Sequence, residues 1–269
     1  MKRVLVVIGL CLLWPLDALA EVSLQGNFTQ GGLVFGTAEP GNRVELDGVR
    51  LGLSSDGRFL IGFGRDAAPT AVLSITGKDG KTSKQTLAVA SREYKIQRID
   101  GLPSRKVTPK PEDLARIKAD NAGIGRVRRL ETASAYFSSG FTWPVSGPLS
   151  GVFGSQRILN GKPKNPHNGT DIAAPEGTII RAPADAVVAL VNDDMFYTGK
   201  TLMLDHGLGL TSVYAHMSAI LVKQGELVKK GAPIGKVGKT GRVTGPHLHW
   251  GVTLGKTHLD PALIAGKMP

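Results

Sequence analysis

The spacing of hydrophobic and polar positions divides the chain into three parts. Residues 21–97 carry short β-rich runs separated by turn signals such as Pro40-Gly41 and Asp56-Gly57. The runs fall at 33–35, 43–46, 59–61, 71–75 and 86–89. Short, regularly spaced strands with glycine turns predict a small β-sandwich for this part.

Residues 98–139 interrupt the β pattern. Proline and glycine residues between 98 and 110 indicate a linker. Pro111, followed by two acidic residues, suits the first turn of a helix. Apolar residues then recur at roughly helical spacing, at Leu114, Ile117, Ile124 and Val127. The pattern predicts a helix over about 111–132 that is frayed or broken near Gly123.

Residues 140–269 return to a β pattern with dense glycine and proline punctuation. The apolar runs fall at 178–180, 186–191, 202–204, 210–214 and 248–254. Because they do not alternate with long helices, an antiparallel or mixed β domain is expected rather than a doubly wound one. The whole chain is therefore predicted to be mainly β, with a small sandwich, a linker helix and a C-terminal antiparallel β domain.

The first twenty residues read as a leader rather than as part of the fold. A basic start at Lys2 and Arg3 precedes a short apolar run and the small residues Ala18 and Ala20. This pattern predicts a secretory signal peptide that is cleaved after Ala20. The run is too short to span a bilayer, so no stable membrane insertion is expected after cleavage. Cys11, the only cysteine, would leave with this segment.

The charge balance bears on the partners. The chain has 33 basic and 22 acidic side chains, a formal net charge of +11. An exported protein rarely meets nucleic acid, and no nucleic-acid-binding motif is present, so nucleic acid is not expected as a partner. A basic surface suits an anionic polymer outside the cytoplasm, such as peptidoglycan with its carboxylates. A surface that only aids solubility is the alternative, which net charge alone does not separate.

All six histidines lie between residues 167 and 258. Four of them, with one aspartate, occur in the phrases H-N-G-T-D at 167–171, V-Y-A-H-M at 213–217 and G-P-H-L-H-W at 245–250. Imidazole and carboxylate are good zinc ligands, and a catalytic zinc site uses three protein ligands and keeps one position open. The inventory thus matches one zinc ion with two histidines left for acid–base work.

Each phrase taken alone also has a simpler explanation. On a strand, His247 and His249 project from the same face, with their Cα atoms about 7 Å apart. An isolated pair of this kind could also be two surface histidines. Pro166 and Gly169 place His167 and Asp171 on a loop that runs into a strand, where a surface ion pair is the alternative. His216 closes a β run and, alone, could be a half-buried histidine bonded to backbone.

Two further histidines have weaker surroundings. His206 is expected at a hairpin turn with a structural role, and His258 is expected on the surface.

The joint pattern resembles the lysostaphin/LytM-type zinc metallopeptidases of peptidase family M23, in particular proteobacterial murein endopeptidases. The resemblance covers about 141–262, nearly half of the chain. Besides the histidine phrases it includes F-T-W-P-V at 141–145, G-V-F-G-S at 151–155 and G-K-T-G-R-V at 238–243. It implies a LytM-type peptidase domain over 140–269, and it excludes the helical HExxH arrangement.

Residue by residue, the resemblance implies that His167, Asp171 and His249 bind one Zn²⁺ and that His216 and His247 flank a water-bearing position. Zinc lowers the pKa of water towards neutrality. No glutamate is placed to take the proton, so His247 is the better general base and His216 the stabiliser of the oxyanion. The sequence leaves open which histidine plays which part.

The resulting expectation is an exported, periplasmic zinc endopeptidase that hydrolyses peptide cross-links or stems of peptidoglycan, of the D-alanyl–diaminopimelate type. Arg157 is a candidate anchor for a stem-peptide carboxylate. The alternative is a non-catalytic or autoinhibited LytM-type regulator that activates a wall amidase, against which the complete ligand set argues. The sequence at 225–238 also suggests a lipoyl-like carrier module. No carrier-type lysine stands out at a hairpin tip, which argues against this alternative. A regulatory protein partner and the role of the N-terminal domain stay open.

Overall fold

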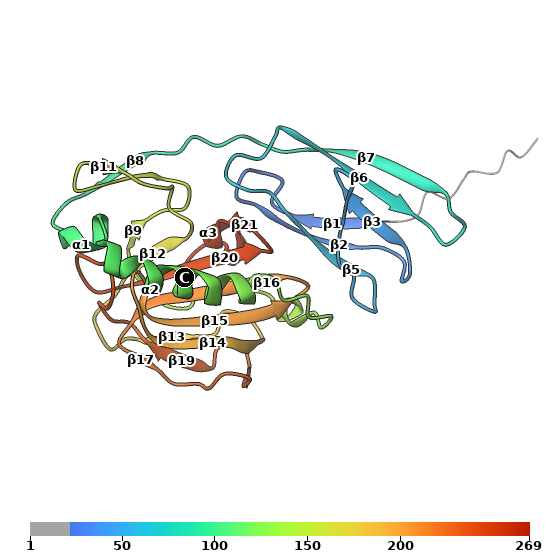
Figure 1. Cartoon of the computed structure of the whole chain (residues 1–269). Helices are drawn as coiled ribbons and strands as arrows, with labels where there is room; N and C mark the ends of the chain where they lie inside the picture. Colours follow the sequence, from blue (N-terminus) through green and yellow to red (C-terminus); the bar gives the residue numbers. More distant parts are fainter. Residues whose placement is uncertain (1–21) are drawn as a thin grey trace, which may run out of the picture.

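The computed structural model describes residues 22–269, so the expected leader and Cys11 lie outside the described residues. Within the described range, no helix is both long and apolar enough to cross a membrane. Figure 1 shows two β-rich bodies that are joined by a segment carrying the longest helix. The mainly β fold expected from the sequence is confirmed.

The N-terminal body is a β-sandwich. One sheet has the order β1-β2-β5 and the other β4-β3-β6-β7. The strands are β1 (Ser23–Gly26), β2 (Leu33–Thr37), β3 (Arg43–Leu46), β4 (Val49–Arg50), β5 (Arg58–Gly62), β6 (Thr70–Thr76) and β7 (Thr82–Ala88). Alternate residues of β6 are buried, so one face of its sheet is apolar. A core drawn from both sheets, including Val34, Phe59 and Leu73, fills the space between them.

Part of the connecting segment packs into the C-terminal body. Its strand β8 (Ile96–Ile99) pairs in parallel with β10 (Gln156–Leu159), which is far away in the sequence. Two helices follow, α1 (Ser104–Val107) and α2 (Pro111–Val127). The connection therefore becomes part of the C-terminal body.

Helix α2 differs from the expectation at two points. It ends at Val127 rather than near 132, and it continues through Gly123 without a break. Gly123 is buried, and a Cβ atom there would lie 3.5 Å from Leu190 Cδ1. Packing against β14 (Ala186–Met195) thus holds the helix together where local propensity is weak.

The C-terminal body is built on an eight-stranded sheet of order β18-β14-β15-β16-β20-β12-β9, with β21 attached to β20. Its neighbours pair antiparallel, as predicted. The strands not yet introduced are β9 (Leu149–Gly151), β12 (Thr170–Ala173), β15 (Gly199–Gly207), β16 (Leu210–Met217), β18 (Leu227–Val228), β20 (His247–Leu254) and β21 (Thr257–Leu259).

Smaller elements complete this body. A second sheet has the order β13-β19-β17, and β10 forms a hairpin with β11. Their bounds are β11 (Lys162–Pro163), β13 (Ile179–Arg181), β17 (Ala219–Ile220) and β19 (Pro233–Lys236), with η1 (Tyr136–Ser139) and α3 (Pro261–Ala265) as short helical turns. Trp250 of β20 and Tyr214 of β16 are fully buried in the apolar core of this body.

The two bodies are in direct contact. Leu33 and Leu60 of the sandwich belong to the same apolar cluster as Leu259 of the C-terminal body. Arg92 Nη1 lies 2.9 Å from Asp260 Oδ2, which joins the end of the sandwich segment to the start of α3. Apolar contact and an ion pair therefore both link the sandwich to the C-terminal body.

Candidate metal centre

The pairing of β12 with β20 brings the predicted ligands together. In this antiparallel register Asp171 lies directly opposite His249. Alternate residues of β20 share a face, so His247 and His249 project together while Leu248 and Trp250 are fully buried. His167 lies on the loop that leads into β12, as the sequence predicts.

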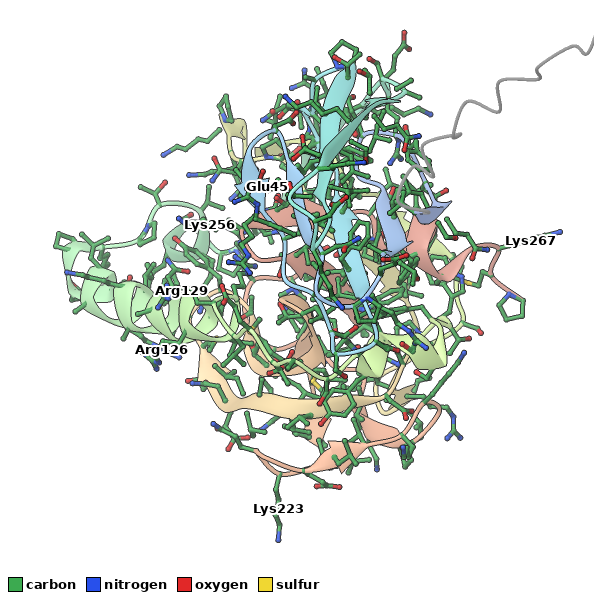
Figure 2. All side chains as sticks on the ribbon, turned by 90° about the vertical axis from the view of Figure 1, so that its right-hand side faces the viewer. Glu45, Arg126, Arg129, Lys223, Lys256 and Lys267 are labelled. Atoms are coloured by element: carbon green, nitrogen blue, oxygen red, sulfur yellow. The ribbon has the colours of Figure 1, made fainter. Side chains whose placement is uncertain are left out.

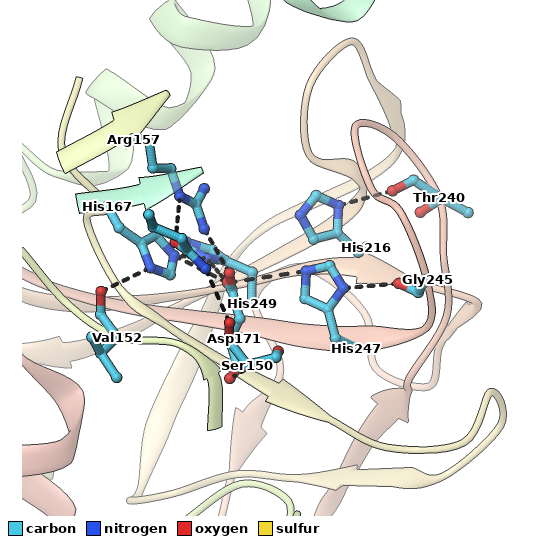
Figure 3. Close-up of polar contacts among 11 residues, drawn as sticks. Ser150, Val152, Arg157, His167, Asp171, His216, Thr240, Gly245, His247 and His249 are labelled. Carbon is cyan, nitrogen blue, oxygen red and sulfur yellow. Dashed lines mark hydrogen bonds and ion pairs between the residues drawn. The ribbon is translucent and has the colours of Figure 1, made fainter. Parts of the chain in front are cut away.

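The three side chains meet at one point, which Figure 3 shows. Asp171 Oδ1 is 2.8 Å from His249 Nδ1 and 3.0 Å from His167 Nε2. The two ring nitrogens are themselves 3.0 Å apart. Each pair is therefore close enough for one small cation to contact all three atoms.

This arrangement fits a zinc ion. Zinc–nitrogen and zinc–oxygen bonds of about 2.0–2.1 Å in a tetrahedron put neighbouring ligand atoms about 3.3 Å apart. His167 Nδ1 lies 3.2 Å from the carbonyl oxygen of Val152, which can only accept a hydrogen bond. The neutral tautomer that donates to this carbonyl turns an unprotonated Nε2 towards the Asp171 carboxylate. Two acceptor atoms that face each other at 3.0 Å need a cation between them.

The protonation states agree with metal ligation. Burial lowers the pKa of His167 to about 4, so its ring is neutral at neutral pH. Burial alone would raise the pKa of Asp171, but its close polar contacts and charge interactions with His167 and His249 hold that pKa well below its usual range. At neutral pH the cluster thus offers neutral imidazole and an ionised carboxylate.

Two glycines of the quoted phrases leave room for this cluster. A Cβ atom at Gly151 would overlap Asp171 Oδ2. A Cβ atom at Gly169 would come within 2.8 Å of the His249 ring. The G-V-F-G-S and H-N-G-T-D phrases therefore let the backbone approach the ligands closely.

Arg157 supports the carboxylate from the other side. Its Nη2 donates to Asp171 Oδ2 at 2.6 Å. Its Nε lies 3.4 Å from Gln97 Oε1, and the Gln97 amide donates to the Ser150 carbonyl at 3.0 Å. Arg157, expected to anchor a substrate carboxylate, therefore already contacts the carboxylate of a candidate metal ligand.

Gln97 is a site residue that sequence reasoning missed. It belongs to β8, which pairs with β10 and so carries it to Arg157. No local motif in R-E-Y-K-I-Q-R-I-D signals this role, since it depends on a parallel pairing between distant segments.

His216 and His247 form a second pair beside the ligands. Their ring centroids are 4.9 Å apart. His216 Nδ1 lies 2.8 Å from the Thr240 carbonyl oxygen, and His247 Nδ1 lies 2.9 Å from that of Gly245. Because carbonyl oxygens accept, each neutral ring donates through Nδ1 and keeps an unprotonated Nε2. His247 Nε2 is 4.0 Å from Asp171 Oδ1.

Buried surroundings and an uncommon backbone conformation distinguish His216. Burial, with the neighbouring His247 and His249 rings, lowers its pKa to about 3. Its φ of 65° lies in the left-handed region, which is costly for a residue with a side chain.

The two remaining histidines lie elsewhere. His206 is completely buried, and its ring nitrogens contact the Asp185 carbonyl oxygen and the Ser212 hydroxyl, which fits the structural role expected for it. His258 was expected on the surface, and this is wrong. The residue is half-buried because β21 pairs with β20, and its Nδ1 is buried without a hydrogen-bond partner.

A cleft of about 160 Å³ opens beside the cluster and is lined by Asp171, His216 and His247. In Figure 3, Arg157 lies on one side of the His216 and His247 rings, and the loop that carries Thr240 and Gly245 lies on the other. The connecting segment contributes Gln97, Ile99 and Leu102 to the lining. A peptide bound here would therefore touch both the histidines and the segment that joins the two bodies.

The chain is similar to peptidases over this region. Residues 165–261, which contain all five predicted site residues, match the model of peptidase family M23. A solved structure from Pseudomonas aeruginosa assigned to peptidase M23 is 31% identical, with a TM-score of 0.68, and the match covers 89% of this chain and 96% of that one.

Curated relatives give shorter matches. Peptidoglycan DD-endopeptidase ShyA of Vibrio cholerae is 47% identical over 85 residues, 32% of this chain and 20% of that protein. Peptidoglycan DD-endopeptidase ShyB of the same species is 42% identical over 131 residues, 49% of this chain and 28% of that protein. DD-carboxypeptidase/endopeptidase Mpg of Neisseria meningitidis is 42% identical over 103 residues, 38% and 24% of the two chains. The chain thus spans about a quarter of the length of these relatives.

Proposed function

The chain belongs to peptidase family M23, and from this premise we propose that it is a zinc-dependent endopeptidase that hydrolyses peptide cross-links or stems of peptidoglycan. The observation that carries the proposal is the convergence of His167, Asp171 and His249 next to a cleft lined by two further histidines. The names of the relatives ShyA, ShyB and Mpg support peptidoglycan as the substrate.

His167, Asp171 and His249 would hold the zinc ion. When bound, zinc polarises a carbonyl oxygen and makes water a nucleophile at neutral pH. The chain's own contribution begins with orientation. The Val152 carbonyl fixes the tautomer of His167, and Arg157 fixes the Asp171 carboxylate, so the ligand atoms keep their directions.

His247 would act as the general base. Its Nδ1 proton is bound to the Gly245 carbonyl, so the lone pair of Nε2 is free and lies next to the ligand cluster. The ring can take a proton from the attacking water and, once protonated, can deliver it to the amine that leaves when the peptide bond breaks.

His216 would work beside it. Its Nε2 is also an acceptor while its Nδ1 donates to Thr240. In this tautomer the neutral ring accepts a hydrogen bond from water, and it stabilises an oxyanion only after it has gained a proton. The hydrogen-bonding pattern therefore favours His216 as a residue that orients water, with oxyanion stabilisation as a later role.

The proposal puts the enzyme in the periplasm, where a cleaved leader would deliver it and where its polymer substrate lies. A regulator without activity would not need a full ligand set with oriented tautomers, so the activator of an amidase is the less favoured alternative.

The proposed function is tested by zinc content and wall digestion. Chain lacking residues 1–20 should contain close to one zinc ion and release peptides from purified sacculi. Chelation and His249→Ala should each abolish both properties. If the unmodified chain binds zinc but releases no peptides from sacculi, the proposed enzymatic activity would be contradicted. Absence of zinc would contradict the metal site.

A further inference from the structure

Arg242 is a charged residue in the cleft that the proposed chemistry does not use. It precedes β20, in the phrase G-R-V-T-G-P-H-L-H, and lines the same cleft as Arg157 and His247. Its backbone N–H donates to the Tyr197 carbonyl at 2.8 Å. Its guanidinium lies over the Tyr197 ring, 4.6 Å from the centroid. Backbone and side chain are thus both held by one neighbouring residue.

Within residues 22–269, the charge of Arg242 has no acidic partner. Among the described residues, no carboxylate forms an ion pair with it, and Asp171 is the one carboxylate that lines the cleft. Both oxygens of Asp171 are already in contact with His167, His249 and Arg157. Burial, and after it the nearby Arg157 charge, lower the pKa of Arg242.

A half-buried cation beside another cation, without a carboxylate, is unfavourable in a folded protein. Such arrangements persist where a ligand supplies the missing charge. Arginine is also suited to this task, because its planar guanidinium binds a carboxylate through two parallel hydrogen bonds. The cleft is therefore prepared for an anionic group at Arg242.

The other residues that line the cleft indicate further properties of the ligand. Ile99, Leu102, Leu159 and Val243 are apolar and line the same cleft as Arg242. A ligand that fits both features carries a carboxylate on an aliphatic chain. The side chain of diaminopimelate has this form. In a direct peptidoglycan cross-link, the carbon atom at its end carries both the acylated nitrogen and a free carboxylate. Lysine has the same chain without that carboxylate.

We infer that Arg242 binds the carboxylate on the carbon atom that carries the scissile amide nitrogen, and so selects diaminopimelate-type over lysine-type cross-links. The inference rests on the proposed function and names the substrate group that the site recognises. Arg242 is here a specificity-determining residue, and Tyr197 is the platform that positions it. The Ile99 and Leu102 side chains of the connecting segment would pack against the aliphatic chain.

The test uses two synthetic cross-linked peptides that are identical except for diaminopimelate or lysine as the acyl acceptor, and a third in which the diaminopimelate carboxylate is amidated. The zinc-loaded chain should cleave the first with a kcat/KM about 10- to 100-fold above the other two. Arg242→Gln should lose about that factor on the first peptide, mainly through KM, and change little on the other two. Arg242→Lys should keep part of the preference, because it retains the charge but not the planar fork.

A matched control is Arg126→Gln. Arg126 is exposed on α2, where Figure 2 labels it, and does not line the cleft that holds Arg242, so its removal should leave all three rates unchanged. Zinc content and melting temperature are measured for each variant, which detects a variant that folds poorly.

The outcomes separate the two proposals. Equal cleavage of all three peptides by the unmodified chain, or an equal loss on all three in Arg242→Gln, would overturn the carboxylate assignment and leave the endopeptidase proposal intact. Cleavage of none of them, with no difference between the unmodified chain and His249→Ala, would contradict the proposed function itself.

Discussion

Arg157 and Asp171 form a 2.6 Å ion pair that engages the carboxylate oxygen turned away from the histidines. Oδ1 faces His167 and His249, while Oδ2 faces the guanidinium. The Arg157 side chain is only 17% exposed, so water competes weakly for this contact. The arginine therefore fixes which oxygen of Asp171 points to the candidate metal position.

The first prediction concerns this pair. Arg157→Ala should weaken zinc binding or turnover by about 10- to 100-fold, because groups that orient metal ligands have effects of this size. Arg157→Lys should lose less, since one charged hydrogen bond can form again. Competition with a chromophoric zinc chelator measures the affinity. A zinc Kd and activity equal to those of the unmodified chain in Arg157→Ala would contradict this role and would also remove Arg157 as an anchor for substrate.

The second prediction separates ligands from acid–base residues. His249→Ala should lose zinc, whereas His247→Ala should keep close to one zinc ion and lose turnover by at least about 100-fold. The reason is that His249 Nδ1 lies 2.8 Å from Asp171 Oδ1, within the candidate ligand cluster, while His247 Nε2 lies 4.0 Å from the same oxygen. Metal content by mass spectrometry and kcat on cross-linked peptides give the two readouts. Loss of zinc in His247→Ala would reverse the assignment.

Local patterns predicted the elements that carry the candidate site. The alternation in H-L-H required only a strand to put His247 and His249 on one face, and β20 is that strand. The loop before β12 followed from Pro166 and Gly169. The antiparallel register that sets Asp171 opposite His249 could not be read from residue types, because many registers satisfy the same apolar pattern.

The features that the sequence did not predict depend on contacts between residues that are distant in the sequence. Gln97 and Ile99 reach the cleft through a parallel pairing with β10, and the linker signals before Pro103 gave no reason to expect a strand there. The continuity of α2 through Gly123 likewise depends on contact with β14. In both cases tertiary packing decides against the local propensity.

The third prediction concerns the contact between the two bodies. Arg92→Ala leaves the buried Asp260 carboxylate without its ion-pair partner and should lower the free energy of unfolding by about 2 kcal/mol. Asp260 also caps α3 through the Ala262 N–H, so the effect should reach that helix. Arg50→Ala, at an exposed position of the sandwich, is the control and should change stability by less than about 0.5 kcal/mol. Urea unfolding measures both, and equal values would show that the pair contributes nothing.

The fourth prediction is a pH dependence of stability that comes from His206. Burial lowers the pKa of His206 to about 4, below the value of 6.5 for an exposed histidine. Between these values the unfolded chain binds a proton that the folded chain does not, so stability falls as the pH decreases from 6.5 towards 4. From pH 7.5 to pH 5 this one group should remove about 2 kcal/mol.

His206→Gln provides the comparison. Its overall stability can differ, but its loss between pH 7.5 and pH 5 should be smaller by that amount when both proteins are unfolded by urea with zinc present. Parallel pH profiles for the two proteins would show that His206 is protonated in the folded chain.

The fifth prediction separates backbone strain from chemistry at His216. Its φ of 65° is one that glycine adopts freely and other residues adopt at a cost. In chelator-treated protein, His216→Gly should therefore be more stable than His216→Ala by about 1 kcal/mol, although glycine normally destabilises a strand by a similar amount. Both variants should be equally impaired in turnover, because both lack the imidazole that accepts a hydrogen bond beside His247. Urea unfolding and kcat measure the two effects. Greater stability of the alanine variant would mean that the backbone relaxes once the ring and its 2.8 Å contact with the Thr240 carbonyl are gone, and that the ring itself holds the strained conformation.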